Sequence, residues 1–239
     1  MYQERVYRRE MNASGLFAYT VAIFESDLMI YTDKMLSEEA HKWTEYYRHE
    51  IETYAHLRPG FIGALAPQMC LKSAPPLIKH MHQASKKAGV GPMAAVAGGI
   101  SYYVGQKLLQ SCNEVMIENG GDIFLKSDTE KKIRIFAGDS PFSNKVALKL
   151  PPSPRGIGIC TSAGKIGHSL SFGNADAVVI VSEDVLLADA VATATGNKIK
   201  TKDYINEGID FAKSIEGVKG IVIIVEDQIG LWGEIELCK

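Results

Sequence analysis

The amino-acid sequence predicts an α+β fold in which antiparallel strands lie beside paired helices. Short apolar runs are joined by tight turns, and the clearest is the Asn-Gly-Gly turn inside VMIENGGDIFLK, residues 115–126. Longer segments with helical spacing lie in pairs between these runs. Consecutive antiparallel strands followed by helices are typical of α+β proteins rather than of parallel wound sheets.

The first half of the chain opens with strands and continues with helices. Ser37, followed by two glutamates, is typical of a helix N-terminus. The segment from Leu57 to Leu77 carries four prolines and predicts an extended connection. Pro92 suits the first position of a further helix. We expect strands at residues 4–10, 14–24 and 27–32, and helices at 37–55, at about 75–88 and from Pro92 onward.

The second half repeats this outline. We expect strands at residues 131–136, 144–150, 156–160 and 176–182, helices at 183–195 and about 203–214, and a final hairpin of 219–225 with 229–237. MAAVAGGI and LADAVATA occupy comparable places, which predicts an internal duplication with pseudo-halves of about 1–140 and 141–239. The prolines at 151–154 are too few for a free linker, so we expect residues 1–239 to form a single domain.

Bulk properties exclude several classes of protein. The net charge of −2 gives no electrostatic case for nucleic acid or for an anionic membrane as a partner. No apolar run approaches the ~20 residues of a membrane span. The charged N-terminal segment is followed by no apolar signal sequence, and the four cysteines form no CxxC pair. We therefore expect a cytoplasmic protein with reduced cysteines.

The glycine-rich segment GICTSAGKIGHSLSFG, from Gly158 to Gly173, is the strongest candidate for a binding site. Its glycines allow the backbone to approach a ligand closely. Thr161 and Ser162, with neighbouring N–H groups, are suited to an anion nest, and Lys165 is suited to neutralise a phosphate. His168 is suited to donate to phosphate or to move a proton, because imidazole titrates near neutrality. The alternative interpretation is an ordinary polar surface loop.

A helix over ADAVATATGN, residues 188–197, adds oxygen ligands. Asp189 and Thr193 are four residues apart, so both oxygens project from one helical face. Such oxygens form part of a Mg²⁺ site that substrate phosphates would complete. Gly98 and Gly99 weaken their own helix, which indicates close packing against another backbone or against a ligand. Loop and helices together predict a pocket for a small phosphorylated ligand.

Several of these motifs together resemble one family. AGVGPMAAVAGGI, ENGGDIF, GICTSAGKIGHSLSFGNADAV, LADAVATATGN and VKGIVIIVEDQIGLWGEIEL are similar to the short ApbE-like branch of the FAD:protein FMN transferase superfamily. The resemblance covers nearly the whole chain. It implies duplicated tunnelling-fold-like units, in which antiparallel sheets are backed by helices. It also implies FAD or FMN and Mg²⁺ as cofactors, with FMN transferred through a phosphoester bond to a threonine of a target protein.

The resemblance also assigns site residues. Its helix motif implies that Asp189 and Thr193 hold Mg²⁺, and its remaining motifs fall on Gly98, Gly99, Gly120, Gly121, Asp122, Thr161, Ser162, Gly164 and His168. Two departures stand out. HSLSFG replaces the family's DPRTG loop, and AGGISYY lacks the lysine and aspartate of its KGWAVD helix.

The leading hypothesis is Mg²⁺-assisted chemistry on a flavin or another phosphorylated small molecule, with His168 and Asp189 as the catalytic residues. A non-catalytic carrier that keeps the pocket without the chemistry is the first alternative. An oligomeric scaffold, in which the glycines serve packing only, is the second. The small residues at 94–99 would permit close approach of subunits, and relatives of this fold associate through their sheets, so we expect a homo-oligomer.

Overall fold

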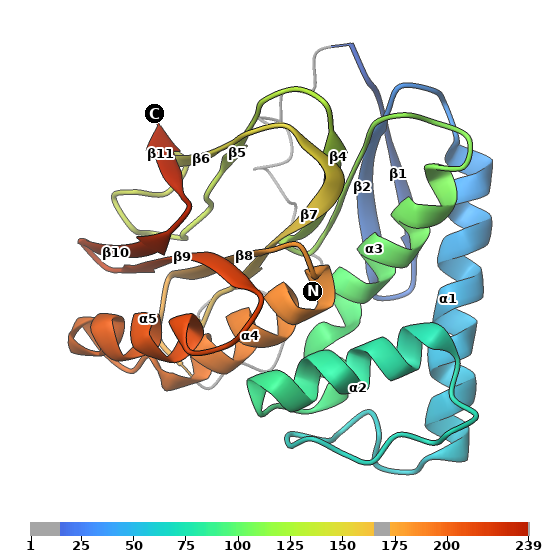
Figure 1. Cartoon of the computed structure of the whole chain (residues 1–239), viewed down its shortest axis with the longest axis horizontal. Coiled ribbons are helices and arrows are strands. Elements are labelled where there is room, and N and C mark those ends of the chain that lie inside the picture. The colour runs from blue at the N-terminus through green and yellow to red at the C-terminus, as the bar shows by residue number, and fades with distance from the viewer. Residues whose placement is uncertain (1–14, 165–172, 239) are drawn as a thin grey trace.

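The computed structural model describes residues 15–164 and 173–238. Its main element is one sheet of eight strands, in which every neighbouring pair is antiparallel (Figure 1). The strands, in their order across the sheet, are β1 (Phe17–Ile23), β2 (Ser26–Thr32), β3 (Val115–Asn119), β4 (Asp122–Ser127), β7 (Ser153–Ser162), β8 (Ala177–Ser182), β9 (Val218–Val225) and β10 (Gln228–Gly233).

Two units of four strands make up this sheet, and they meet where β4 pairs with β7. In each unit a pair of strands is followed by helices and then by a second pair. The helices of the first unit are α1 (Ser37–Leu57), α2 (Pro76–Ala88), the 3₁₀ turn η2 (Pro92–Ala95) and α3 (Val96–Leu108). Those of the second are α4 (Val185–Lys198), the 3₁₀ turn η3 (Lys202–Tyr204) and α5 (Ile205–Lys213). The predicted α+β fold of duplicated antiparallel units is confirmed.

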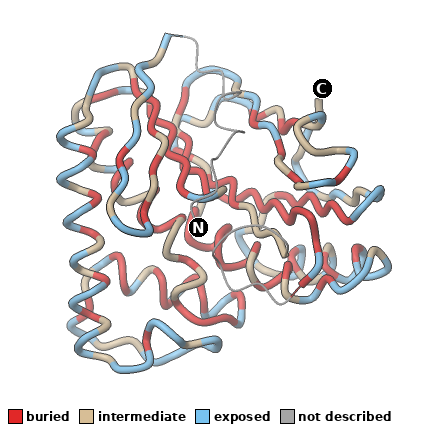
Figure 2. The backbone as a smooth tube through the Cα atoms, turned by 180° about the vertical axis from the view of Figure 1, so that it is seen from behind, coloured by how far each residue is buried: buried red, intermediate tan, exposed pale blue. Residues whose placement is uncertain are grey.

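Each face of the sheet buries its own core. The described helices pack on one face, and a three-stranded sheet of β5 (Lys131–Arg134), β6 (Ala147–Leu150) and β11 (Glu236–Cys238) covers part of the other. Side chains alternate between the two cores along each strand, as the pleat of a strand requires. Phe124 of β4 faces the helices, whereas Ile123 and Leu125 face the small sheet. The central strands are therefore buried along most of their length (Figure 2).

Three elements differ from the sequence expectation. The helix expected at about 203–214 starts as the 3₁₀ turn η3, and regular α-helix begins at Ile205. The helix expected from Pro92 starts as a 3₁₀ turn, and regular α-helix begins only at Val96. The strand expected at 229–237 is divided, because Gly233 has a φ of +99° and turns the chain. Its second part, β11, then pairs with β6 in the small sheet. The strand expected at 4–10 lies outside the described residues.

The termini of α2 and α4 follow local sequence signals. Gly89 ends α2 with a φ of +75°, and the Asp184 side chain caps α4 by accepting the N–H of Leu187 at 3.0 Å. His80 of α2 lies 3.0 Å from the same oxygen of this cap, Asp184 Oδ1, and so connects the two helices. Among the helices in the described parts of the chain, none is both long and apolar enough to cross a membrane.

Candidate functional site

Among the residues that the structure describes, several of those singled out by the sequence lie where the two units of the sheet meet. The β3–β4 hairpin tip lies beside the end of β7, and Asp122 is in register with Cys160. Above these strand ends lie the start of α3 and the middle of α4. Strand alternation directs Asp122, Cys160 and Ser162 toward the helices, on the same face as Phe124.

Asp189 lies in this junction as a buried carboxylate, with 6% of its surface exposed. Its Oδ2 accepts the N–H of Gly98 at 2.8 Å. A Cβ at Gly98 would lie 3.0 Å from the Asp189 Cβ, so glycine permits this approach of α3 to α4. Burial raises the pKa of Asp189 to about 7, although the N–H groups of Gly98 and Ala97 act in the opposite direction.

A second buried carboxylate, Asp122, interacts with Asp189. Burial is the main cause that raises the Asp122 pKa well above its usual range, and the negative charge of Asp189 adds to it. The Cys160 thiol and the N–H of Thr161 donate to Asp122 and lower its pKa in part. Two ionised carboxylates in a dry interior repel each other, so this pair favours either a shared proton or a bound cation.

Cys160 is the buried thiol beside this pair. Burial, followed by the charges of Asp122 and Asp189, raises its pKa well above the usual thiol range. Its Sγ also lies 3.5 Å from the Val185 carbonyl, a second acceptor for the single thiol proton. A thiol that stays protonated is a poor nucleophile, so Cys160 serves packing and hydrogen bonding here.

The hairpin tip lies next to the junction, and Gly120 in the tip is exposed. Gly120 and Gly121 have φ values of +69° and +104°, which favour glycine at both positions. The N–H of Gly121 donates to Glu118 Oε1 at 2.7 Å, and Glu118 itself is fully buried. Asn119 donates through Nδ2 to the Ala97 carbonyl at 3.3 Å and so connects the hairpin to α3. Glu118 and Asn119 were not among the predicted residues; polar residues at the end of an otherwise apolar strand were the available signal.

The loop residues fall on two sides of the sheet. Ser162 faces α4, where a Cβ at Gly196 would lie 3.1 Å from its Oγ. Thr161 points to the opposite face and lies next to Gly121, whose Cβ would be 3.6 Å from the Thr161 Cβ. The N–H of Gly164 donates to the Ala175 carbonyl at 2.8 Å. Lys165 and His168 lie outside the described residues.

The remaining predicted residues lie on the helices. Thr193 is half-buried, one turn after Asp189 on α4. Gly99 packs against protein, since a Cβ there would lie 3.1 Å from Leu77 Cδ1 and 3.4 Å from Leu186 Cδ2. Close packing therefore accounts for Gly99, whereas Gly98 also contributes the N–H that holds Asp189.

Thr195 lies two residues beyond Thr193 on α4, and its hydroxyl allows a test of how much an unsatisfied buried polar group lowers the free energy of unfolding. It is fully buried, and its Oγ1 has no hydrogen-bond partner among the residues that the structure describes. Replacing Thr195 by valine removes the unsatisfied hydroxyl at nearly constant volume, so we expect the free energy of unfolding to rise by about 1 kcal/mol. Urea unfolding measures this change. Thr193→Val, at a half-buried position, is the control and should leave stability within about 0.5 kcal/mol of wild type; a destabilised Thr195→Val would contradict the assignment.

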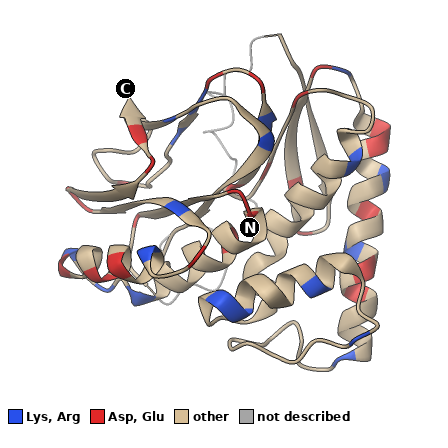
Figure 3. Ribbon diagram, viewed as in Figure 1, with Lys and Arg blue, Asp and Glu red and all other residues tan. Residues whose placement is uncertain are grey.

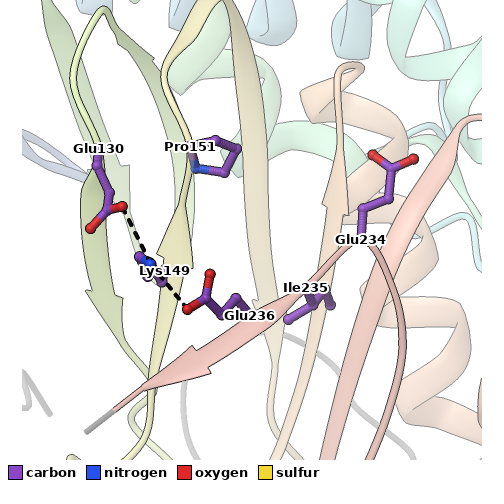
Figure 4. A pocket seen from close by; sticks show the side chains of 6 residues that line it. All are labelled: Glu130, Lys149, Pro151, Glu234, Ile235 and Glu236. Carbon is purple, nitrogen blue, oxygen red and sulfur yellow. Dashed lines mark hydrogen bonds and ion pairs between the residues drawn. The ribbon is translucent and has the colours of Figure 1, made fainter.

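A separate hollow lies on the small sheet (Figure 4). Its volume is about 260 Å³, below the range of about 300–1,000 Å³ usual for ligand pockets, and it is lined by Glu130, Lys149, Pro151, Glu234, Ile235 and Glu236. Lys149 lies between two of these carboxylates, 3.0 Å from Glu236 and 3.6 Å from Glu130. Since its ammonium is already paired and no predicted site residue lines the hollow, we place the candidate site at the junction of the two units.

Comparison with known proteins places the chain in a family. A family model described as "AbpE bacteria" matches residues 8–229. The chain belongs to this AbpE family. Among its relatives is the UPF0280 protein of Methanosarcina acetivorans, 38% identical over 200 residues that cover 83% of this chain and 79% of the relative. The UPF0280 protein of Methanocella arvoryzae is 40% identical over 189 residues, with coverage of 79% and 77%.

Solved structures show the same fold for this AbpE-family chain. The flavin transferase ApbE from Vibrio cholerae matches with a TM-score of 0.60 at 11% identity, covering 91% of this chain and 96% of that one. The flavinyl transferase ApbE of Pseudomonas stutzeri, in its apo form, matches with a TM-score of 0.58 at 13% identity, covering 91% and 93%. At this identity the likeness concerns the fold.

Proposed function

We propose that this AbpE-family chain binds a flavin dinucleotide together with Mg²⁺ at the junction of its two units and transfers the flavin phosphate group. The buried Asp122–Asp189 pair is the observation that carries the proposal, because a bound cation would stabilise two carboxylates that burial keeps from ionising together. The glycine tip at Gly120–Gly121 lies beside it and lets a ligand approach the backbone. The two solved structures of the same fold are of a flavin transferase and a flavinyl transferase, which supports the ligand class.

The chemistry of the donor set fits Mg²⁺. Asp189 accepts N–H groups from Gly98 and Ala97, and a carboxylate has about four lone-pair sites, so acceptor capacity is left for an ion. The Thr193 hydroxyl lies one turn further along α4. Mg²⁺ prefers such hard oxygens and completes its shell with water and phosphate oxygens. When bound, it would neutralise charge on the diphosphate and polarise a phosphoryl oxygen.

The chain's own groups have distinct roles in this proposal. Lys165 of the glycine-rich segment holds the phosphate charge that the metal leaves uncovered. His168 takes the proton from the acceptor hydroxyl as the FMN phosphorus–oxygen bond forms and the bond to AMP breaks. The acceptor is a hydroxyl of a protein. A carrier that binds flavin without turnover is the alternative, since HSLSFG and AGGISYY differ from the transferase motifs.

Calorimetric titration with FAD, FMN and ADP, with and without Mg²⁺, tests the proposal. We expect the diphosphate ligands FAD and ADP to gain affinity from Mg²⁺, worth about 1–3 kcal/mol, the usual size of coupling between two ligands. Asp189→Asn should abolish this gain and Thr193→Val should reduce it. Production of AMP from FAD separates a transferase from a carrier.

Two matched variants serve as controls. Asp33 accepts backbone N–H groups from Asn113 and Glu114 at the opposite end of β2 and β3 from the glycine tip, so Asp33→Asn removes a carboxylate away from the junction. Thr195→Val removes a hydroxyl from the same helix as Thr193. Both should keep the Mg²⁺ dependence of wild type. Equal Mg²⁺ dependence in Asp189→Asn and wild type would refute the site.

A further inference from the structure

The connection from the end of α1 to the start of α2 exposes an unusual number of apolar side chains. Residues 58–75 run along one edge of the molecule, below α2 in Figure 1, and most of them are exposed (Figure 2). Four large apolar side chains of this region face solvent: Leu57 (66% exposed), Ile62 (56%), Leu65 (61%) and Met69 (84%). We call Ile62, Leu65 and Met69 the apolar tip.

Buried contacts hold this connection in one conformation. Phe61 is 1% exposed, and its ring packs edge-on against Tyr54 of α1 with 4.9 Å between centroids. The Tyr54 hydroxyl accepts the N–H of Leu71 at 3.2 Å, and His82 Nδ1 lies 3.1 Å from the Gln68 carbonyl, to which it donates. Because the backbone is anchored from both helices, the exposure of the tip is a fixed feature of the surface, and little ordering entropy remains to oppose binding.

The charged side chains of this stretch of the sequence have one sign. Residues 59–71 contain no charged side chain, and they are flanked by Arg58 and Lys72. The whole stretch 53–113 contains no aspartate or glutamate, so α2 carries only basic charges (Figure 3). Lys79 and Lys86 lie on the exposed face of α2 and form no ion pair with another described residue. The nearest preceding acidic residue, Glu52, is paired with Arg48 at 3.2 Å.

We propose that the apolar tip and the basic residues Arg58, Lys72, Lys79 and Lys86 form a docking surface for an anionic lipid bilayer. An uncharged apolar tip inserts between headgroups, while the basic side chains that flank it in the chain and those on α2 meet lipid phosphates. An anionic bilayer offers hydrocarbon and phosphate together, which matches exposed apolar side chains combined with basic charges. The chain would lie on such a surface without spanning it.

The stretch without acidic residues revises the expectation, drawn from the net charge, that the protein has no electrostatic attraction to an anionic membrane. The value of −2 averages this stretch with acidic residues elsewhere in the chain, and it therefore hides a basic surface. Local attraction depends on the charges within a Debye length of the membrane, about 8–10 Å, rather than on the total.

Vesicle co-sedimentation of the full chain tests the proposal. Wild type should sediment with vesicles of phosphatidylcholine and phosphatidylglycerol and remain in solution with phosphatidylcholine alone. Leu65→Asn/Met69→Asn and Lys72→Glu/Lys79→Glu should each weaken binding by about tenfold or more. All four side chains are exposed, so these variants should fold as wild type does.

Matched controls use exposed residues on other parts of the surface. Met35→Asn/Leu231→Asn removes the same two residue types, which are 53% and 49% exposed, and Lys132→Glu/Lys145→Glu reverses two exposed lysines. Both should bind vesicles as wild type does. The proposal fails if the wild-type protein does not bind anionic vesicles, or if the control variants lose binding as much as the test variants do. It also fails if sedimentation velocity shows that Leu65→Asn/Met69→Asn abolishes self-association, because the tip would then contact a second copy of the chain.

Discussion

Replacing Asp189 by asparagine should stabilise the metal-free protein at about pH 8 and have little effect at about pH 4. Asparagine keeps an oxygen that accepts the Gly98 N–H, and it removes the charge that burial opposes. Because the substitution removes a buried charge that acts on Asp122, its effect measures what the two carboxylates cost the fold when no cation is present.

Whether Asp189→Asn stabilises or destabilises the protein at a given pH follows from the direction of the Asp189 pKa shift. The pKa of Asp189 rises from 3.8 to about 7 on folding, so between these values the folded protein binds more protons than the unfolded chain. Stability from this group is therefore fully present below about pH 4 and is lost as the pH rises through about 7. The difference in unfolding free energy between Asp189→Asn and wild type should grow by roughly 3–4 kcal/mol over this interval.

Urea unfolding in the presence of a chelator, at several pH values, measures this difference. Asp33→Asn is the control, because the pKa of Asp33 is shifted in the opposite direction from that of Asp189. Burial of Asp33 raises its pKa, but the N–H groups of Asn113 and Glu114 lower it further, to below its usual range. Its contribution to stability is thus constant between about pH 5 and pH 8 and is lost only in acid. A pH-independent difference for Asp189→Asn would mean that Asp189 ionises as readily in the folded protein as in the unfolded chain, and burial would then not raise its pKa.

Local sequence signals predicted most elements of the fold. The glycine turn at 119–122, the helix start at Ser37 and the prolines between α1 and α2 each act over a few residues, so their consequences were visible in the chain itself. The break of the last strand at Gly233 was not predicted, because the sheet that a strand joins depends on partner strands far away in the sequence. β11 pairs with β6, and no residue near Glu236 in the sequence indicates that pairing.

In the candidate site too, some features could be predicted from local sequence, and others depend on contacts between distant parts of the chain. Asp189 and Thr193 on one helical face follow from spacing alone. The contact of Asp189 with Gly98, and its electrostatic interaction with Asp122, needed the packing of α3 and α4 on the sheet. Thr161 and Ser162 were treated as one nest, whereas the strand extends to Ser162 and so sends the two side chains to opposite faces.

Removing the ring of Phe124 should cost the fold more stability than removing a hydroxyl or a carboxylate from α4, about 3–5 kcal/mol for Phe124→Ala. The ring is 1% exposed and lies between two glycines. A Cβ at Gly105 of α3 would lie 2.6 Å from Phe124 Cε1, and a Cβ at Gly156 of β7 would lie 2.6 Å from Cε2. The missing side chains let α3 approach the sheet closely, and the same helix carries the Gly98 N–H to Asp189.

This arrangement predicts strong coupling between Phe124 and Gly105. In wild type, Gly105→Ala places a methyl group against the ring and should be destabilising, despite the higher helix propensity of alanine. In the Phe124→Ala background the same methyl enters the cavity and should be stabilising. A double-mutant cycle by urea unfolding should therefore give an interaction free energy of about 1–3 kcal/mol. Phe124→Leu provides an intermediate point, with a smaller cavity and a smaller loss. Equal effects of Gly105→Ala in both backgrounds would show that the ring does not set the distance between α3 and the sheet, and the position of the Gly98 N–H would then need another cause.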